Sequence, residues 1–425
     1  GTGKTLAYAI PAAVWARATG QQVVVSSSTK ALQDQLLGDL EQRVQPGLPF
    51  HFRYSVLKGQ ENYLCLTRLW NAYREAFINP QASKISFEEK LVLLYLLRYA
   101  EESSDGDLQN TSYWLQKRFP ILEYLKIQLC SERETCGSAC DYYGFCFHPR
   151  AKAYADFSDI LVVNHSLLLV RRWAEDRLLN LVLDEAHNLE EAATNAYTEE
   201  ASRIQIETLL SRLLRSGDDR GILVLARRWM QDPAIIGHAI GTVRRLRKRI
   251  QEFGGYLREY VSKRGVNFSP KYGAVLRLRA APMKVNYFAW QHVQRPLDEI
   301  LRELGQLYRE TTEIHRQLSE ADKKAEPLVK ELDAVRVRLF GLPEEPGQRS
   351  LLEELPQVNF DPLVLVHWIE LEIKGNPTND QIAPHQINWA FKRAPVSVAK
   401  HLEDKVYQRT RALVLTSATL TMAEG

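Results

Sequence analysis

Short runs of consecutive apolar residues alternate with longer segments of helical periodicity along this chain. The runs lie at 23–25, 160–163, 181–183 and 411–416, with a weaker one at 54–57. Continuous apolar runs of this length are typical of strands buried on both faces of a parallel sheet. Residues 6–18 and 30–40 have apolar positions at helical spacing, and Thr29 is placed to cap the second helix. The pattern predicts an α/β fold.

Two long segments interrupt this alternation. Residues 61–157 are aromatic, contain cysteines and are helical in places, whereas residues 190–390 are mostly amphipathic helix. Between 297 and 339, apolar side chains recur every seven residues at two positions, as in the seam of a coiled coil. Because Pro327 disturbs a continuous helix, we expect an antiparallel helical pair that bends or breaks near it and projects from the core.

Composition limits the function only weakly. The 425 residues are 45% hydrophobic and 25% charged, with a formal net charge of +3. This charge permits a nucleic-acid partner without arguing for one, so any basic surface is expected to be local. No run of about 18 apolar residues and no signal-peptide pattern is present, so we expect a cytoplasmic protein without a membrane segment.

The chain begins inside a phosphate-binding motif. Gly1-Thr2-Gly3-Lys4-Thr5 is the second half of G-x-x-x-x-G-K-S/T. In this motif, backbone N–H groups surround the phosphates, the lysine reaches the β- and γ-phosphates, and the hydroxyl binds Mg²⁺. A chance match in a loop is the alternative. Because the motif is cut and no initiator Met precedes it, we expect the chain to be a fragment of a larger protein.

A second motif, Asp184-Glu185-Ala186-His187, directly follows the apolar run at 181–183. A carboxylate at the end of a buried strand beside a phosphate loop is placed to hold Mg²⁺, which predicts that role for Asp184. Glu185 is then the candidate base that polarises the attacking water. A helix start rich in acidic residues is the alternative, since carboxylates favour first turns. The phosphate loop favours the functional interpretation.

Three small residues, Ser417-Ala418-Thr419, follow the last apolar run. Their hydroxyls are candidates for linking the region of Asp184 and His187 to a moving partner. Taken alone, the segment is better explained as an ordinary helix cap.

Four of the five cysteines lie within 17 residues, at positions 130, 136, 140 and 146. Cys136, Cys140 and Cys146 share one loop, and Cys65 is a candidate fourth ligand. Four thiolates suit zinc or an iron–sulfur cluster, and the paired C-x2-C spacing usual for structural zinc is absent. Buried cysteines without a metal are the alternative. Cys130 is expected to be spare.

Other conspicuous residues have plainer interpretations. The basic run at 244–249 is expected to be a solvated face paired with acids rather than a stripe that contacts phosphates. Tyr287, Phe288, Trp290 and Trp368 are expected in the core rather than as base-stacking platforms.

The order of these motifs resembles the DinG/XPD family of superfamily 2 iron–sulfur DNA helicases, on the DinG/YoaA side. The resemblance rests on the phosphate loop, the cysteine loop, S-S-S-T-K-A-L-Q at 26–33, L-K-G-Q-E-N-Y-L-C at 57–65, V-V-N-H at 162–165, L-D-E-A-H at 183–187 and T-S-A-T-L at 416–420. Together these segments span the whole chain.

The resemblance implies a RecA-like P-loop domain with a parallel sheet, interrupted by two mostly helical insertions. The implied divisions are helicase domain 1 at 1–60, 158–195 and 390–425, an Fe–S domain at 61–157 and an arch domain at 196–389. The second helicase domain is expected to be missing, because the chain stops just after 419. Hence this fragment alone is not expected to unwind DNA.

For activity, the resemblance implies ATP hydrolysis that drives 5′-to-3′ movement on single-stranded and forked DNA in repair or replication. The implied location is the bacterial cytoplasm, at the nucleoid. The implied ATP-site residues are Gly1, Thr2, Gly3, Lys4 and Thr5, with Thr5 and Asp184 on Mg²⁺ and with Asp184, Glu185 and His187 as the catalytic set.

The resemblance also assigns residues outside the ATP site. Thr29 and Gln33 match a segment that faces the DNA backbone, and Ser417 and Thr419 would couple hydrolysis to motion. Cys65, Cys136, Cys140 and Cys146 would hold a 4Fe–4S cluster. The x3 spacing between Cys136 and Cys140 departs from the x4 of the bacterial members, which leaves Cys130 as the competing ligand.

Two other function classes remain open at this stage. One is a non-enzymatic nucleic-acid-binding module with a degenerate ATP site and zinc in place of iron. The presence of Lys4, Asp184 and Glu185 argues against degeneracy. The other is a fusion in which a nuclease domain lies upstream.

Overall fold

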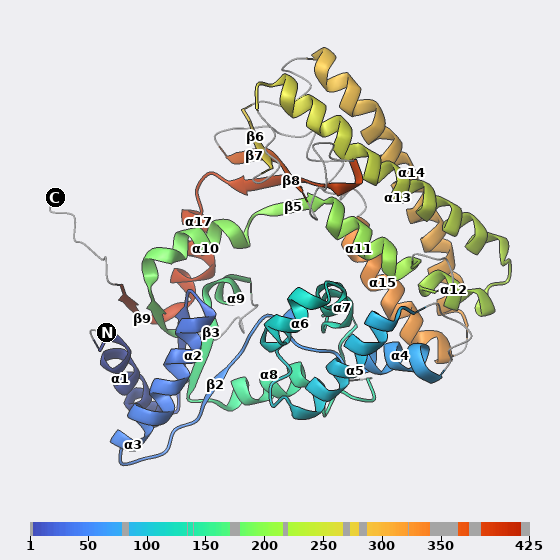
Figure 1. The fold of residues 1–425 in the computed structure, drawn as a ribbon. Coiled ribbons are helices and arrows are strands. Elements are labelled where there is room, and N and C mark those ends of the chain that lie inside the picture. Colours follow the sequence, from blue (N-terminus) through green and yellow to red (C-terminus); the bar gives the residue numbers. More distant parts are fainter. Residues whose placement is uncertain are drawn as a thin grey trace.

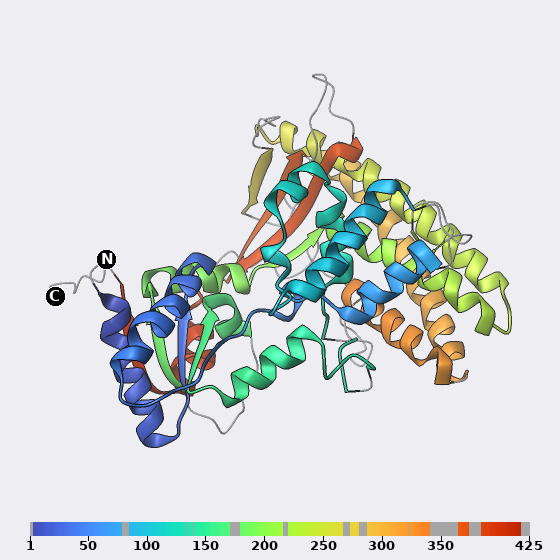
Figure 2. The same cartoon turned by 60° about the horizontal axis from the view of Figure 1, so that its bottom comes forward.

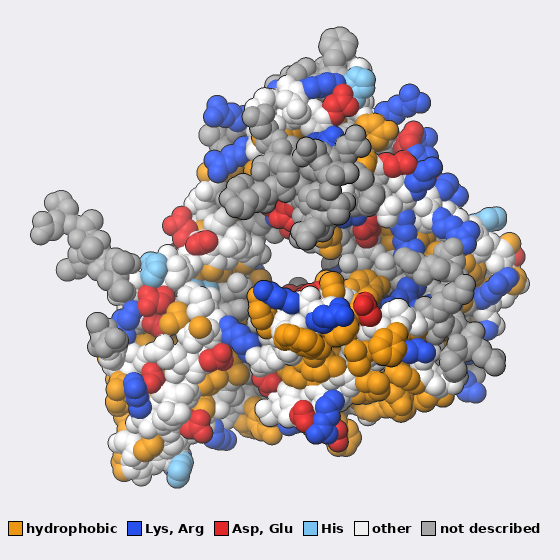
Figure 3. Space-filling model, viewed as in Figure 1, with side chains coloured by type: hydrophobic (Ala, Val, Ile, Leu, Met, Phe, Trp, Pro, Cys, Tyr) orange, Lys and Arg blue, Asp and Glu red, His pale blue; other side chains and the backbone are white. Residues whose placement is uncertain are grey.

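The computed structural model describes residues 3–78, 85–133, 135–138, 140–170, 179–215, 220–266, 273–279, 287–321, 323–340, 364–373 and 384–417. Three parts surround a central opening: a parallel sheet with its helices, a group of shorter helices, and a set of long helices (Figures 1 and 3). The predicted α/β fold class is confirmed. None of the described helices is both long and apolar enough to span a bilayer.

The first sheet contains five strands in the order β2-β3-β1-β4-β9, and every neighbouring pair is parallel. Its strands are β1 (Val23–Ser27), β2 (Tyr54–Val56), β3 (Ile160–Asn164), β4 (Leu179–Asp184) and β9 (Thr410–Thr416). All five runs named from the sequence therefore form strands. The prediction that the run at 411–416 is buried is wrong, because β9 lies at the edge of the sheet with Leu413, Val414 and Leu415 exposed. The register places Asp184, the last residue of β4, opposite Thr416, the last residue of β9.

Helices cover both faces of this sheet, which explains why its central strands are continuously apolar. Val23 and Val25 of β1 pack into the cluster that contains residues of α1 (Lys4–Thr19) and α2 (Lys30–Asp39). Val24 points to the opposite cluster, formed with α9 (His165–Val170), α10 (Leu189–Ala196) and α17 (Ala399–Lys405).

The cysteine-bearing segment forms a second unit with its own core. Its helices are α4 (Leu66–Tyr73), α5 (Phe87–Glu102), α6 (Tyr113–Arg118), α7 (Ile121–Leu129) and α8 (Phe147–Phe157). Leu64, Leu93 and Leu122 are completely buried in this core, and Cys130 lies in the same cluster. Figure 2 shows these light-blue and cyan helices beside the long helices.

The long helices belong to a third unit, which also contains a sheet that the sequence pattern did not predict. The helices are α11 (Arg203–Leu213), α12 (Ile222–Ala226), α13 (Ala234–Lys263), α14 (Tyr287–Ser319) and α15 (Glu326–Phe340). The antiparallel sheet has the order β5-β8-β7-β6, from Glu199–Ser202, Ile387–Pro395, Leu365–Ile373 and Ala274–Leu278. Trp389 of β8 fixes the sheet on α13, because its indole N–H donates to Ile250 O at 3.1 Å.

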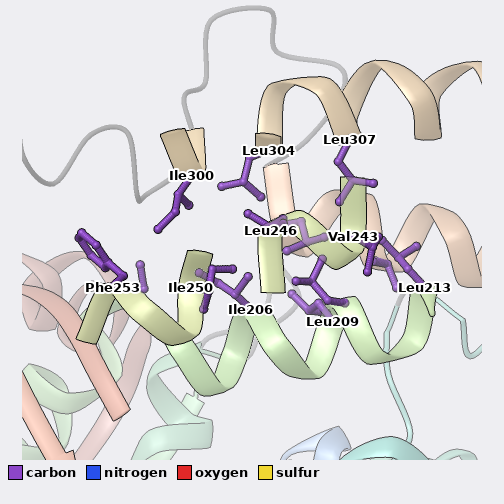
Figure 4. Packing of buried hydrophobic residues seen from close by; sticks show 14 of the residues in the cluster. Ile206, Leu209, Leu213, Val243, Leu246, Ile250, Phe253, Ile300, Leu304 and Leu307 are labelled. Carbon is purple, nitrogen blue, oxygen red and sulfur yellow. The ribbon is translucent and has the colours of Figure 1, made fainter. Parts of the chain in front are cut away.

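The predicted seven-residue seam is present on α14, but it packs mainly on α13 rather than on the second half of the segment 297–339. Ile300, Leu304 and Leu307 of α14 face Val243 and Ile250 of α13 (Figure 4). The chain leaves the helix after Ser319 rather than near Pro327. Pro327 lies in the first turn of α15, where a missing N–H costs nothing.

Ion pairs show that α13 and α14 run antiparallel. Arg245 pairs with Glu303 at 3.0 Å, and Arg249, one turn further along α13, pairs with Glu299, one turn back along α14. These contacts agree with the predicted pairing of the basic run with acids.

A buried ion network joins the cysteine-bearing unit to the long helices. Arg68 of α4 pairs with Glu132 at 2.7 Å and with Glu331 of α15 at 3.1 Å. Arg212 of α11 reaches the same two carboxylates, at 2.7 Å and 2.5 Å. Arg338 pairs with Glu132 at 2.6 Å. The three arginines draw the pKa of Glu132 down to about 2, although its burial acts in the opposite direction.

We expect Glu132→Gln to lower the free energy of unfolding by about 3–5 kcal/mol, because it leaves Arg68 and Arg212 buried with one carboxylate removed. Urea denaturation followed by circular dichroism measures the effect. Glu320→Gln is the matched control, since Glu320 pairs with Arg316 at an exposed surface, where such a pair contributes about 1 kcal/mol or less. Equal losses in the two variants would contradict a structural role for the network.

Candidate nucleotide and metal sites

Helix α1 begins directly after Gly3, so its free N–H groups point at the phosphate-loop residues. Gly3 has φ of 74°, a left-handed conformation that a side chain would strain. Ala7 N donates to Gly3 O at 3.2 Å, which closes the first turn. The N-terminus of a helix favours anions because of its dipole and its unpaired N–H groups. Gly1 and Thr2 lie outside the described residues.

The end of β4 brings the two candidate carboxylates, Asp184 and Glu185, to this helix terminus. Lys4 Nζ lies 2.5 Å from Glu185 Oε1. Glu185 has φ of 53° and is the one residue other than glycine with positive φ in the described part of the chain. Strain of this kind persists only where the surroundings hold it, and it concentrates at functional sites. The turn after β4 therefore has a conformation that redirects the chain at the position of the candidate base.

Asp184 is buried, and each of its carboxylate oxygens accepts a hydrogen bond. Thr416 Oγ1 donates to Oδ1 at 2.6 Å, and Tyr8 Oη donates to Oδ2 at 3.2 Å. Thr5 precedes Tyr8 by about one turn of α1, so Thr5 and Asp184 both lie near the Tyr8 phenol. Burial and the charge of Asp184 raise the pKa of Tyr8, which keeps the phenol protonated as a donor.

Tyr8 and Thr416 were not identified from the sequence. Tyr8 lies three residues after Thr5, hence on the same face of α1. Thr416 is the register partner of Asp184. The position of Tyr8 beside Thr5 was predictable from helical spacing. The position of Thr416 beside Asp184 depends on the pairing of β4 with β9.

His187 and Ser417 are in contact. His187 Nδ1 lies 2.7 Å from Ser417 Oγ and 3.4 Å from Glu185 Oε2. The histidine thus connects the candidate base to the segment that follows β9. Thr419 lies outside the described residues.

Four further polar residues lie near the same edge of the sheet. Ser26 Oγ and His165 Nδ1 are 2.7 Å apart, and burial lowers the pKa of His165. Thr29 caps α2 as predicted, since its Oγ1 accepts from Leu32 N at 3.3 Å. Gln33 is buried, with 3% exposure, so its amide is not presented to solvent.

The cysteine thiols converge without forming a complete ligand shell. Cys65 and Cys146 precede α4 and α8. The interaction between the two thiols lowers the pKa of Cys65 and raises the pKa of Cys146. Cys136 interacts electrostatically with Cys65 and with Cys140. Among the described residues, no three His, Cys, Asp or Glu side chains are grouped closely enough to hold a metal ion.

Cys130 has a different environment from these four thiols. Its Sγ donates to Ile127 O at 3.2 Å, and burial raises its pKa to about 11. Four thiols, with Cys130 set apart, are the type and number of donors that a thiolate-ligated centre uses. The residue types therefore suit such a centre, although the described thiols are not grouped closely enough to hold a metal ion.

Chemically, the edge of the parallel sheet combines a cation, a helix N-terminus and two carboxylates. The oxygens of Thr5 and Asp184 are the ligands that Mg²⁺ prefers. Lys4 and the N–H groups of α1 suit phosphate oxygens. The Glu185 carboxylate, the candidate base, lies beside Lys4.

Comparison with known proteins agrees with this chemistry. The family described as DEAD/DEAH box helicase matches residues 1–87. ATP-dependent helicase DinG of Mycobacterium tuberculosis (strain ATCC 25618 / H37Rv) is 31% identical over 236 residues, which make up 52% of this chain and 35% of that protein. ATP-dependent DNA helicase YoaA of Escherichia coli (strain K12) is 30% identical over 217 residues, 48% of this chain and 31% of that protein.

A third relative aligns over nearly the whole chain. It is named 3'-5' exonuclease DinG, from Bacillus subtilis (strain 168), and is 26% identical over an alignment of 439 positions. The alignment covers 99% of this chain and 43% of that protein. The chain therefore spans less than half the length of each of these relatives. The matches confirm the resemblance predicted from the motifs.

Tyr8→Phe tests the hydrogen bond on Asp184. We expect a loss of about 1.5–3 kcal/mol in the free energy of unfolding, because a buried carboxylate oxygen loses its donor. Thermal or urea unfolding measures the loss, with Tyr407→Phe, at an exposed position, as the matched control. An unchanged Tyr8→Phe protein would show that the hydrogen bond does not stabilise the site.

Proposed function

We propose that this chain, a homologue of the DinG and YoaA helicases, is the ATP-hydrolysing motor part of a DNA helicase. The observation that carries the proposal is the meeting of Lys4, Asp184 and Glu185 at the N-terminus of α1. A phosphate-binding loop joined to an acidic strand end is the arrangement that phosphoryl transfer requires.

In this proposal, Lys4 binds the β- and γ-phosphates and exchanges its contact with Glu185 for the nucleotide. Thr5 and Asp184 hold Mg²⁺, which when bound neutralises charge on the transferred phosphoryl group. Glu185, released from Lys4, orients and deprotonates the attacking water. Gly1, Thr2 and Gly3 complete the phosphate loop.

Coupling of hydrolysis to movement is assigned to His187, Ser417 and Thr419. The contact of His187 with both Glu185 and Ser417 supports this assignment, since it gives the base a direct link to the chain beyond β9. Thr29 and Gln33 are proposed to contact the DNA backbone, which requires the amide of Gln33 to leave its buried position.

The nucleic acid is proposed to be single-stranded or forked DNA, moved in the 5′-to-3′ direction. The opening between the three parts supports a strand path (Figure 3). The parallel sheet corresponds to helicase domain 1, the cysteine-bearing unit to the Fe–S domain and the long helices to the arch, with the limits given above. A role in repair or replication in the bacterial cytoplasm belongs to the same proposal.

Cys65, Cys136, Cys140 and Cys146 are proposed to hold a 4Fe–4S cluster that braces the cysteine-bearing unit. The interaction between the thiols of Cys65 and Cys146 supports this set. The position of Cys130, which donates to a backbone carbonyl in the core, supports its exclusion.

The rival class, a binding module with a degenerate ATP site and zinc, is not favoured. A degenerate site is expected to lose its lysine or its acidic pair. Here all three side chains are present, and Lys4 contacts Glu185, the residue that follows Asp184.

Glu185→Gln is expected to reduce ATP hydrolysis by about 10²- to 10⁴-fold while nucleotide binding is retained, because the amide cannot accept the proton of water. DNA-stimulated ATPase in the full-length protein and nucleotide affinity by calorimetry provide the two readouts. Glu190→Gln, in the first turn of α10, is the control. Full activity in Glu185→Gln would remove this residue from the proposed role.

Cys136→Ser and Cys140→Ser are each expected to lose the bound iron and sulfide and the visible absorbance of the cluster, whereas Cys130→Ser keeps them. Metal analysis of anaerobically purified protein provides the measurement. Stoichiometric zinc without iron would favour the rival class, and loss of iron in Cys130→Ser would mean that Cys130 is a ligand.

A further inference from the structure

A cavity of about 510 Å³ lies between the cysteine-bearing unit and the long helices. Its walls come from α4 and α7 on one side and from α11, α12 and α15 on the other. None of the nucleotide-site residues or cysteines described above lines it. The volume is in the range of sites that bind small molecules.

The side chains of this cavity are strongly biased toward positive charge. Seven arginine and lysine residues line it, against two carboxylates, Glu75 and Glu331. Arg220 has its side chain only 9% exposed, at 4.0 Å from Glu75. Cations therefore outnumber carboxylates on the walls of the cavity, and a surface of this kind favours a bound anion.

The arginines of the cavity differ in how far they are already paired. Arg68 and Arg212 belong to the buried network with Glu331, and Arg215 pairs with Glu89. Arg74 and Arg228 are exposed and have no carboxylate partner within the described part of the chain. Two guanidinium groups at the rim are thus available, and guanidinium forks match phosphate oxygens bidentately.

Aromatic rings lie beside the same cations. The Arg228 guanidinium is 3.6 Å from the ring centre of Trp229, and Arg215 lies 5.8 Å from the ring centre of Tyr124. Trp229 and Tyr124 both line the cavity. A planar base can stack on such rings while phosphates reach the arginines. This combination of charge and aromatic surface indicates a nucleotide rather than an inorganic anion.

We propose that this cavity binds one free nucleotide, separate from the nucleotide site at Lys4. Its phosphates contact Arg74, Arg220 and Arg228, and its base packs on Trp229 or Tyr124. A bound nucleotide would contact α4 of one unit and α12 of the other, so it would hold the cysteine-bearing unit against the long helices. The site is independent of the function proposed above.

The test uses protein that carries Lys4→Ala, which removes the main phosphate ligand of the other site. Isothermal titration with ADP in the absence of Mg²⁺ is expected to show saturable binding at one site. Arg74→Gln combined with Arg228→Gln weakens this binding by about tenfold or more, since each arginine contributes charge-assisted hydrogen bonds. Both residues are exposed, so the fold is retained, and thermal unfolding verifies this.

Arg98→Gln, an exposed arginine on α5 outside the cavity, is the matched control and leaves ADP affinity unchanged. Arg220→Gln is a second variant with the same expected direction. The proposal is overturned if ADP does not bind the Lys4→Ala protein, or if the double variant binds it as tightly as Arg98→Gln does. Inorganic pyrophosphate that binds as tightly as ADP would exclude the aromatic contact. Displacement of ADP by short oligothymidine would assign the cavity to a DNA strand instead.

Discussion

Every residue of the candidate ATP site reaches its place because β1, β4 and β9 run parallel and end at the same edge of one sheet. The register sets Asp184 opposite Thr416, so the two are hydrogen-bonded although distant in sequence. The helix that follows the phosphate loop packs on the same strands and brings Lys4 to Glu185. If the order of strands changed, the lysine and the carboxylates would no longer share a space. The insertions can be long because they leave and re-enter the sheet without disturbing this edge.

The sequence predicted those features that depend only on residues close together in the chain. Continuous apolar runs predicted all five parallel strands, and Thr29 was identified as a helix cap, because both signals depend on neighbouring residues. The antiparallel sheet was missed, since β6, β7 and β8 come from separate stretches of a mostly helical region and are stabilised by pairing with one another. The helical spacing places Tyr8 on the same face of α1 as Thr5, but its partner was not predictable from that spacing. Its role depends on Asp184, which lies 176 positions away.

Charge has two different uses in the insertions. On α13, Arg245 and Arg249 of the basic run are matched by Glu303 and Glu299 across an antiparallel helix pair. Between the two units, buried arginines are paired with carboxylates that come from other elements. Desolvated charges of this kind specify one arrangement of the units, because a wrong docking would leave them without partners. The basic run that stands out in the sequence is therefore structural, whereas arginines in and beside α4 and on either side of α12 line a cavity.

The position of β9 also has a consequence for how the chain folds during synthesis. Thr416 lies 232 positions after Asp184, so β9 emerges from the ribosome only after the unit of long helices has been made. Until then β4, which is mostly apolar and buried on both faces in the finished fold, is an edge strand with an open row of hydrogen-bonding groups. Contacts of such high sequence separation form slowly. Nascent chains therefore expose the edge of β4 while the unit of long helices is being made, and β9 joins the parallel sheet only afterwards.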